Sequence, residues 1–209
     1  MPGRRYARIF FNIDAMNAPI PLAAIGTDEF KGAMRRLAGG VSIVTSSYDG
    51  SRFGLAVTAV CSVSLSPPSL LVCVNRASSS HEPIRLSGSF CVNVLHDGHE
   101  DIARRFGSSK LRDIRFDGGD WRTLVTGASA LVGATVSFDC RVRESLFAHS
   151  HSIFIGEVVA VELGGGRTPL VYFDGAYMTT APVPLAERQS SAVAPSRSVP
   201  TAKEGGGTS

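Results

Sequence analysis

The chain has 209 residues, of which 44% are hydrophobic, and a formal net charge of +3. This length supports one domain with a buried core, and the mean hydropathy of +0.12 is that of a globular protein. The small charge, without a basic stripe interleaved with aromatics, argues against nucleic acid as a partner, and no apolar run approaches the ~20 residues of a membrane span.

The cysteine pattern indicates the cellular compartment in which the protein works. Each one lies inside an apolar, strand-like pattern, and none forms a CxxC pair or a zinc-ligand spacing. We therefore expect buried free thiols in a reducing, cytoplasmic protein without a bound metal. The four residues are Cys61, Cys73, Cys91 and Cys140.

The chain divides into three parts by composition. Residues 1–25 lack periodicity and are expected to be an N-terminal extension, within which Met16 is an alternative start. Residues 26–180 carry the strand and helix patterns of one domain. From 181 to 209 the composition turns to Ser, Ala, Pro and Gly, which predicts a disordered tail.

The domain is expected to open with a helix. Thr27 or Asp28 is predicted to cap it, and Gly39-Gly40 to end it. Its apolar stripe has helical spacing and consists of Phe30, Met34 and Leu37. A strand over 41–47 follows, and Tyr48-Asp49-Gly50-Ser51 is typical of a hairpin turn into the next strand.

The next stretch, which Pro67-Pro68 is expected to end, carries the most informative pattern. Its odd positions are apolar and predict a core face, namely Leu55, Val57, Ala59, Cys61, Val63 and Leu65. Its even positions are mostly small or hydroxylated, namely Ala56, Thr58, Val60, Ser62, Ser64 and Ser66. This second face is either a shallow shelf, on which a flat ligand lies close to backbone, or simply the solvated side of a sheet.

A hydroxyl-rich turn follows the shelf. Leu70–Val74 predicts a strand buried on both faces, and the turn over 75–80 leads into a short helix from His81 with Ser80 as its N-cap. With Arg76 beside the hydroxyls, the turn is either an anion site or an ordinary helix cap.

The remaining pattern is mostly strands. An alternation from Val132 to Val142 predicts a long half-buried strand, with 153–163 as its partner, and Glu157 there is expected at a bulge or paired with an arginine. The other expected elements are a strand at 90–95, a helix at 99–106, a loop over 108–126 and a closing hairpin at 170–179. Many short strands with few helices predict an antiparallel barrel or sandwich.

Five motifs along the chain point to a known family. They are FKGAMRRLAGGVSIVTS, GLAVTAVCSVSLSPPSLLVCVNRASSS, FCVNVL, HSIFIGEV and PLVYFDGAY. In this order and spacing, Phe30–Thr180 resembles the flavin reductase-like family, the small NAD(P)H:flavin oxidoreductases of two-component monooxygenases. The resemblance implies a mainly β fold, the FMN-binding split β-barrel with antiparallel Greek-key strands and a few short helices. It also implies a homodimer with sites near the subunit interface.

The resemblance carries site residues over to this chain. The flavin ring would lie against the shelf and meet Thr58, Ala59, Val60, Ser62 and Ser64. The ribityl and phosphate end would meet Asn75, Arg76, Ser78, Ser79 and Ser80. Phe106 either contacts the flavin tail or packs its own helix into the core.

His151 matches the family's histidine near the nicotinamide and would position NAD(P)H against the flavin. The common Gly-Asp-His reads His149-Ser150-His151 here, so a partner for the imidazole is lost. His149 and His151 are expected on one strand face, where a metal clip is an alternative without an evident third ligand. His81 either assists phosphate binding or starts its helix, and His96 and His99 are expected at the surface.

The functional prediction is an NAD(P)H-dependent flavin reductase that transfers hydride to FAD or FMN and supplies reduced flavin to a separate monooxygenase. NADH is preferred to NADPH because no arginine pair for a 2′-phosphate is evident. The chain shows no nucleophile–base arrangement or close carboxylate pair, which suits hydride transfer between bound cofactors. The alternatives are a non-catalytic flavin carrier and a flavin-retaining oxidase on the same fold.

Overall fold

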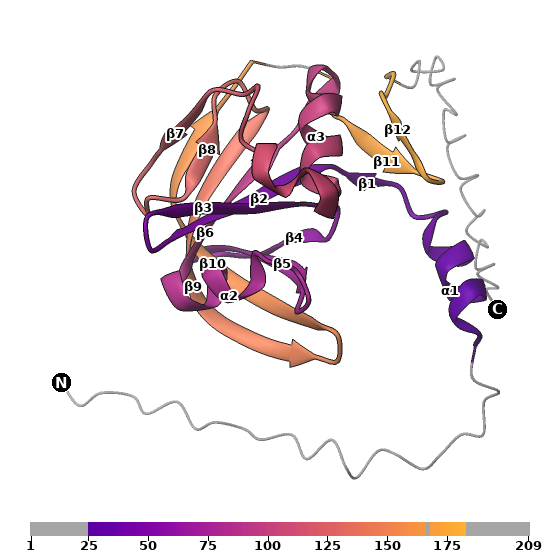
Figure 1. The fold of residues 1–209 in the computed structure, drawn as a ribbon, viewed down its shortest axis with the longest axis horizontal. Helices are drawn as coiled ribbons and strands as arrows, with labels where there is room; N and C mark the ends of the chain where they lie inside the picture. Colours follow the sequence, from indigo (N-terminus) through magenta and orange to yellow (C-terminus); the bar gives the residue numbers. More distant parts are fainter. Residues whose placement is uncertain (1–24, 166–167, 183–209) are drawn as a thin grey trace, which may run out of the picture.

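The computed structural model describes residues 25–165 and 168–182, so the predicted extension and tail fall almost entirely outside the described residues. Its centre is one antiparallel sheet in the order β3-β2-β6-β9-β10-β5-β4 (Figure 1). These strands are β2 (Ser42–Tyr48), β3 (Ser51–Val57), β4 (Val60–Leu65), β5 (Pro68–Asn75), β6 (Ser89–Val94), β9 (Val136–Ala148) and β10 (His151–Leu163).

Short helices and two small sheets complete the described fold. The helical segments are α1 (Thr27–Met34), α2 (His81–Ser87), η2 (Asp97–His99), α3 (Glu100–Gly107) and η3 (Ser109–Ile114). The small sheets contain β1 (Gly39–Gly40), β11 (Val171–Phe173) and β12 (Ala176–Met178), and β7 (Trp121–Thr123) with β8 (Ser129–Leu131). None of the helices in the described ranges is long and apolar enough to cross a membrane.

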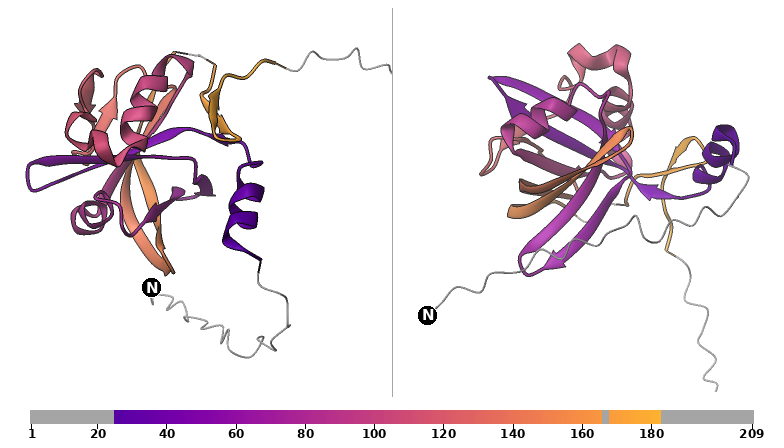
Figure 2. Two further views of the ribbon diagram at one scale, coloured as in Figure 1. Left: turned by 45° about the vertical axis from the view of Figure 1, so that its right-hand side comes forward. Right: turned by 90° about the horizontal axis from the view of Figure 1, so that it is seen from below.

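The large sheet is curved. β3 and β4 follow each other in the chain yet lie at opposite edges of the sheet, so the sheet must curl for the chain to pass from one edge to the other. Figure 2 shows this open barrel from two further directions. No ladder joins β3 to β4 among the described strands, and the barrel stays open. The predicted antiparallel, mainly β fold is confirmed.

The long ribbon of β9 and β10 bends at two register shifts. Gly156 lies at the first of them, and a Cβ there would come within 2.6 Å of the buried Phe90 ring. Glycine is therefore what lets β10 cross over this ring. The neighbouring Glu157 lies in register with Arg141, between the two shifts, and its carboxylate accepts from Arg143 Nε at 2.6 Å. The expected pairing with an arginine is therefore confirmed, whereas the glutamate does not itself lie at a bulge.

Successive residues of β2 pack into two different apolar clusters, one on each face of the sheet, because side chains alternate across a strand. Val44 packs in a cluster with Phe90 and Phe154 and with Ile84 of α2, whereas Ile43 packs in a second cluster. That second cluster contains Leu95, Ile102, Phe106 and Leu131 and lies under α3. Each fully buried side chain of this size contributes roughly 1.5–3 kcal/mol.

The predicted hairpins are confirmed. Asp49 and Gly50 have φ of 49° and 70°, and Asp174 and Gly175 have φ of 47° and 87°. Two successive residues of positive φ form the tight turn that matches strand twist, which is why Asp-Gly joins β2 to β3 and β11 to β12.

The continuous strand predicted from Leu55 to Leu65 is wrong. The chain leaves the ladder at Thr58 and Ala59, and the apolar positions beyond that break do not enter the core. Cys61 is exposed, Val63 is half exposed and Leu65 is 94% exposed. A period of two indicates that one face of the strand is apolar, but it does not show what packs on that face. On the edge strand β4, no described residue covers it.

Burial was predicted wrongly at several other positions. Only alternate residues of β5 are fully buried, so Leu71 and Cys73 are half-buried and the strand is not buried on both faces. The thiols of Cys91 and Cys140 are buried, as expected, whereas those of Cys61 and Cys73 are not. His96, expected at the surface, is buried because its strand-like segment bridges Pro169.

Two segments differ in extent from their predictions. The region 108–126 contains η3 and β7 rather than loop alone. The long strand begins at Val136 instead of Val132, because Gly133, with φ of 84°, turns the chain between β8 and β9.

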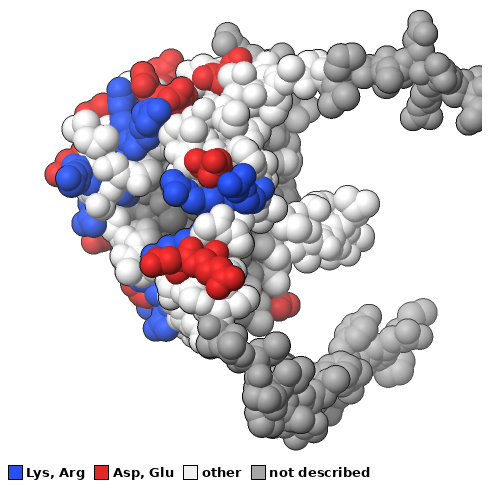
Figure 3. All heavy atoms as spheres, turned by 90° about the vertical axis from the view of Figure 1, so that its right-hand side faces the viewer, with Lys and Arg blue, Asp and Glu red and all other residues white. Residues whose placement is uncertain are grey.

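The elements α1, β1, β11 and β12 project from the barrel as an arm (Figures 1 and 2). Gly26 is the N-cap of α1 and makes no side-chain cap bond, so the predicted cap at Thr27 or Asp28 is wrong. α1 buries none of its residues, and its apolar stripe faces solvent in the protomer. Figure 3, seen from the side of the arm, shows charges of both signs close together among white surface rather than one large patch of a single sign.

Candidate active site

The first part of the site is the corner between β3 and β4. Thr58 and Ala59 are exposed there and border an apolar hollow of about 660 Å³ that α1 and the following turn also line. Gly39 makes this corner possible, because a Cβ at that position would lie 2.8 Å from Thr58 Cβ. The corner therefore presents backbone and small side chains to the hollow.

The shelf predicted beyond the corner is the edge strand β4. Cys73 donates its backbone N–H to Ala59 O at 3.2 Å, and Val60 and Ser62 pair with Val72 and Leu70 of β5. Ser64 lies past a register shift, and its hydroxyl accepts from Ser66 N at 3.0 Å in the β4–β5 turn. The Ser64 hydroxyl therefore already has a hydrogen-bond partner, at the end of the shelf away from the corner.

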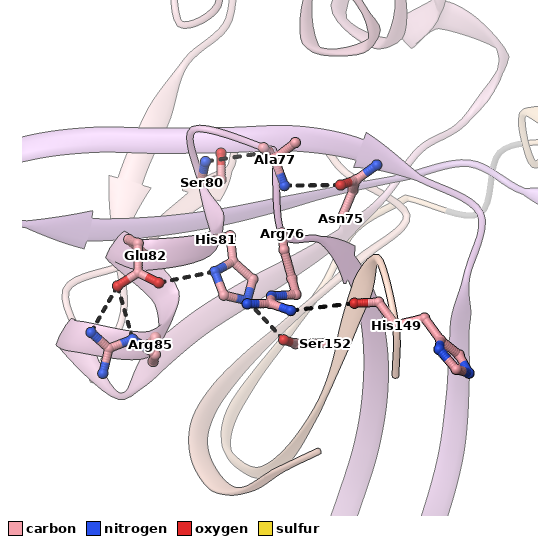
Figure 4. A network of polar contacts seen from close by, with 10 residues as sticks. Asn75, Arg76, Ala77, Ser80, His81, Glu82, Arg85, His149 and Ser152 are labelled. Atoms are coloured by element: carbon pink, nitrogen blue, oxygen red, sulfur yellow. Dashed lines mark hydrogen bonds and ion pairs between the residues drawn. The ribbon is translucent and has the colours of Figure 1, made fainter. Parts of the chain in front are cut away.

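The turn 75–80 is built by its own side chains. Asn75 Oδ1 accepts from Ala77 N at 2.9 Å, and Ser78 Oγ accepts from Ser80 N at 3.3 Å (Figure 4). Ser80 occupies the N-cap position of α2 without making a side-chain cap bond, and its buried Oγ has no partner among the described residues. Asn75 and Ser78 therefore shape the turn.

A second hollow, of about 580 Å³, lies between this turn, α2 and the β9–β10 hairpin. His81 is buried beside it, with Nε2 2.8 Å from Ser152 Oγ and Nδ1 3.2 Å from a carboxylate oxygen of Glu82. Arg85 pairs with Glu82 and lowers the pKa of that carboxyl. Figure 4 shows these side chains together with Arg76, whose guanidinium donates to His149 O at 3.4 Å.

His151 is the first residue of β10, and its side chain is exposed. Its Nδ1 lies 2.9 Å from Ser150 Oγ, so the serine supplies a partner where the family pattern has aspartate. His149 lies in the hairpin turn with φ of 53° and does not share a strand face with His151, which corrects that prediction. Residues 25–165 and 168–182 contain no group of three His, Cys, Asp or Glu that could hold a metal.

The sheet places the corner and His151 on opposite sides of one strand, β5. Asn75 lies opposite His151, and Cys73, two residues earlier on β5, bonds to Ala59. Strands lie ~4.8 Å apart, so β4 and β10, on either side of β5, are separated by roughly 10 Å. A ligand at the corner and a side chain at His151 would therefore lie on the same stretch of sheet, with β5 between them.

Two predicted residues lie elsewhere. Phe106 is 2% exposed and packs against Phe116 and Trp121, so core packing is the interpretation that the structure supports. Ser79 lines a third hollow, with arginines of β3, η3 and the turn after η3. Sequence reasoning missed this arginine cleft, although four arginines between positions 104 and 115 were a signal for it.

Comparison with known proteins agrees with this architecture. The family model described as "Flavin reductase like domain" matches residues 34–181. The chain is 42% identical over 173 residues to a protein of Ancylobacter novellus named FMN reductase (NADH) RutF, which covers 83% of this chain and 93% of that protein.

Two solved structures are similar in fold and sequence. A putative flavin reductase from Haemophilus somnus matches with a TM-score of 0.72 and 33% identity, over 75% of this chain and all of that one. BorF, the flavin reductase component of a bacterial two-component tryptophan halogenase, matches with a TM-score of 0.68 and 30% identity, over 74% of this chain and 98% of that one. The chain described here belongs to the flavin reductase-like domain family.

Proposed function

We propose that the protein is an NADH-dependent flavin reductase with FMN as its principal acceptor. The observation that carries this proposal is the exposed corner at Thr58 and Ala59, which leads into β4, the strand next but one to the β10 strand of His151. The relatives named FMN reductase (NADH) support the choice of both substrates.

The residues at the corner suit a flavin. Thr58, Ala59, Val60 and Ser62 would meet the ring, with little side-chain bulk between the ligand and backbone N–H groups. The turn 75–80 would meet the ribityl chain and phosphate, and the unpartnered buried Ser80 Oγ is a polar atom available there. Hydride transfer from C4 of the nicotinamide to N5 of the flavin is chemistry that these two molecules supply once bound.

The protein's part in that reaction is binding and orientation. His151 would hydrogen-bond the nicotinamide end of NADH, and Ser150 would hold the imidazole by its Nδ1 so that Nε2 faces the ligand. No described residue needs to act as a nucleophile. Because the two cofactors supply the hydride chemistry and the protein only binds and orients them, small side chains and one exposed imidazole suffice and no acid–base pair is needed.

We also propose a homodimer, with the site next to the interface. Large apolar side chains that no described residue covers lie on α1 and β4 and just after α1, namely Phe30, Met34, Leu37, Val63 and Leu65. A soluble protein rarely leaves such a set facing water, and a second copy would cover it. The hollow between α1 and the corner would then be completed by the partner subunit.

Reduced flavin would leave for a separate oxygenase. In support, the relative BorF is named as the flavin reductase component of a two-component tryptophan halogenase. Binding of flavin must then be moderate, because a flavin held too tightly would not be released. Residues 26–180 would form the whole catalytic domain. The four cysteines, all free, suit a cytoplasmic location.

The test is NADH oxidation by the purified protein with increasing FMN or FAD. The expected result is turnover that requires NADH and saturates in added flavin, with flavin lost from the protein on gel filtration. Flavin binding without NADH oxidation would favour a carrier, and stoichiometric retained flavin with an organic substrate would favour an oxidase.

His151 is tested in the same assay. His151→Ala should raise KM for NADH more than KM for FMN, and His151→Gln, which keeps a hydrogen-bonding side chain, should recover part of the loss. Equal effects on both KM values would contradict a role at the nicotinamide.

A further inference from the structure

The imidazole of His81 is a buried polar group that the proposed hydride transfer does not use. It belongs to the first residue of α2, is 3% exposed, and lies 5.5 Å from the ring of Phe154, a member of an apolar cluster. Its Nε2 is 2.8 Å from the hydroxyl of Ser152, which is 1% exposed. A polar pair in such surroundings is costly unless its hydrogen bond is made, and the bond then fixes how α2 and β10 lie against each other.

Glu82 sets the direction of this hydrogen bond. One of its carboxylate oxygens lies 3.2 Å from His81 Nδ1, and the hydrogen bond from Arg85 lowers the pKa of the carboxyl. An ionised carboxylate only accepts, so in the neutral imidazole Nδ1 carries the proton and Nε2 accepts from the Ser152 hydroxyl. Figure 4 shows this chain of carboxylate, imidazole and hydroxyl.

The chain has the order of groups found in a serine hydrolase, but it is not placed for that chemistry. A nucleophilic hydroxyl must reach a substrate, and the Ser152 side chain is almost completely buried. The arrangement is therefore a fixed link between α2 and the start of β10.

Ser152 anchors the end of the β9–β10 hairpin. Among residues 143–153, all of which the structure describes, it is the one buried residue. Leu146 and Phe147 are exposed, so apolar packing does little to hold this end of the hairpin against the rest of the domain. Backbone pairing with β5 fixes one edge of the hairpin, and the bond between His81 and Ser152 fixes its buried face.

The anchor lies next to the imidazole that the proposed function places at the nicotinamide. Ser152 follows His151 directly, so the two side chains point to opposite faces of β10. Ser150 holds the His151 ring relative to the hairpin, and His81 holds the hairpin relative to the domain. Both links are needed to place the ring, and small errors in such placement slow a reaction strongly.

We propose that His81 is a positioning residue for the reductase: its bond to Ser152 anchors the β9–β10 hairpin and thereby keeps the His151 imidazole where the nicotinamide binds. This inference rests on the proposed function, in which His151 contacts NADH, and adds a residue that acts through another.

The test breaks the bond from both ends and follows KM for NADH with FMN as acceptor. Ser152→Ala should raise KM for NADH by about tenfold, the effect of one buried hydrogen bond, and leave KM for FMN unchanged. His81→Phe should act in the same way. His81→Gln should recover part of the loss, because its amide reaches the position of Nε2.

Ser137→Ala is the matched control. Ser137 lies on β9 and is as buried as Ser152, and its hydroxyl donates to Asn93 Oδ1 at 2.8 Å, away from the hairpin turn. Its removal should lower the unfolding free energy to a similar extent and leave KM for NADH unchanged. If both variants raise KM for NADH equally, the effect is one of stability alone and the inference is overturned.

A double variant shows whether the effect passes through His151. In a His151→Ala background, Ser152→Ala should add nothing to KM for NADH, because the imidazole that it positions is gone. A rise in KM of the same size in both backgrounds would overturn the inference.

Amide hydrogen exchange, measured by mass spectrometry without NADH or flavin, tests the anchor independently of activity. Exchange over residues 146–151 should be faster in Ser152→Ala and His81→Phe than in Ser137→Ala and the parent protein. Unchanged exchange would overturn the inference, even in an active reductase. A protein that oxidises no NADH, but whose hairpin loosens in these two variants, would refute the reductase and leave the anchoring of the hairpin by His81 standing.

Discussion

Gly54→Ala is the substitution that most directly tests how the core supports the site. A Cβ at position 54 would lie 2.5 Å from Phe106 Cε1 and 3.2 Å from Val44 O. The Phe106 ring cannot retreat easily, because it is 2% exposed and packed against Phe116 and Trp121. Overpacking of this kind costs about 1–3 kcal/mol of unfolding free energy.

The assay is urea unfolding at fixed protein concentration, with Gly40→Ala as the control, because a Cβ at Gly40 meets nothing within 4 Å. At about 2–4 °C per kcal/mol for a domain of this size, Gly54→Ala should also lower Tm by roughly 2–12 °C. If Gly54→Ala unfolds at the same urea concentration as Gly40→Ala, the tight packing inferred between β3 and α3 is wrong.

Three further predictions concern other parts of the fold. Asp139→Ala should lower the unfolding free energy by about 2–4 kcal/mol, measured in urea, because the buried carboxylate accepts from Val125 N and Thr126 N at 2.7 Å each. The thiols of Cys91 and Cys140 should resist alkylation at pH 8 until the protein is unfolded, because burial raises the pKa of both, that of Cys140 to about 12, as peptide mass spectrometry would check. Leu65→Asp should weaken the proposed homodimer by about 100-fold in Kd, measured by analytical ultracentrifugation, since a charge would enter an apolar interface.

Each of these predictions has a clear contrary result. An Asp139→Ala protein as stable as the parent would mean that water replaces the carboxylate. Rapid alkylation of the native thiols would mean that β6 and β9 open readily. A monomeric parent protein, or an unaffected Leu65→Asp dimer, would exclude β4 from the interface.

The sequence predicts strands and hairpins well where an Asp-Gly pair marks the turn between two strands. Asp49-Gly50 and Asp174-Gly175 supply the positive φ that two tight hairpins need. The turn at His149-Ser150 lacks the Asp-Gly pair of the other two hairpins, although His149 also takes positive φ. The sequence therefore does not mark where the hairpin between the two longest strands turns. The pairing of its strands was nevertheless predicted from their alternation.

Burial was harder to predict than secondary structure. The alternation at Val63 and Leu65 looks the same whether the apolar side faces a core or lies exposed on an edge strand, so the pattern does not distinguish the two. Phe106 and the arginine cleft depend on how α3 and η3 pack against β3, which one sequence does not reveal. The pattern alone leaves two interpretations for the corner and for the turn, because small and hydroxylated side chains are common on solvated sheets. Only the resemblance favours a flavin there, and these site residues stay a prediction.

The most direct test of the proposed reductase is an anaerobic experiment with a trace of protein, excess FMN and excess NADH, followed by loss of the FMN absorbance. The expected result is reduction of many FMN molecules per protein chain, which requires both hydride transfer at the site and release of the reduced flavin. Reduction that stops at one FMN per chain, or no reduction at all, would contradict a flavin reductase that supplies free reduced flavin.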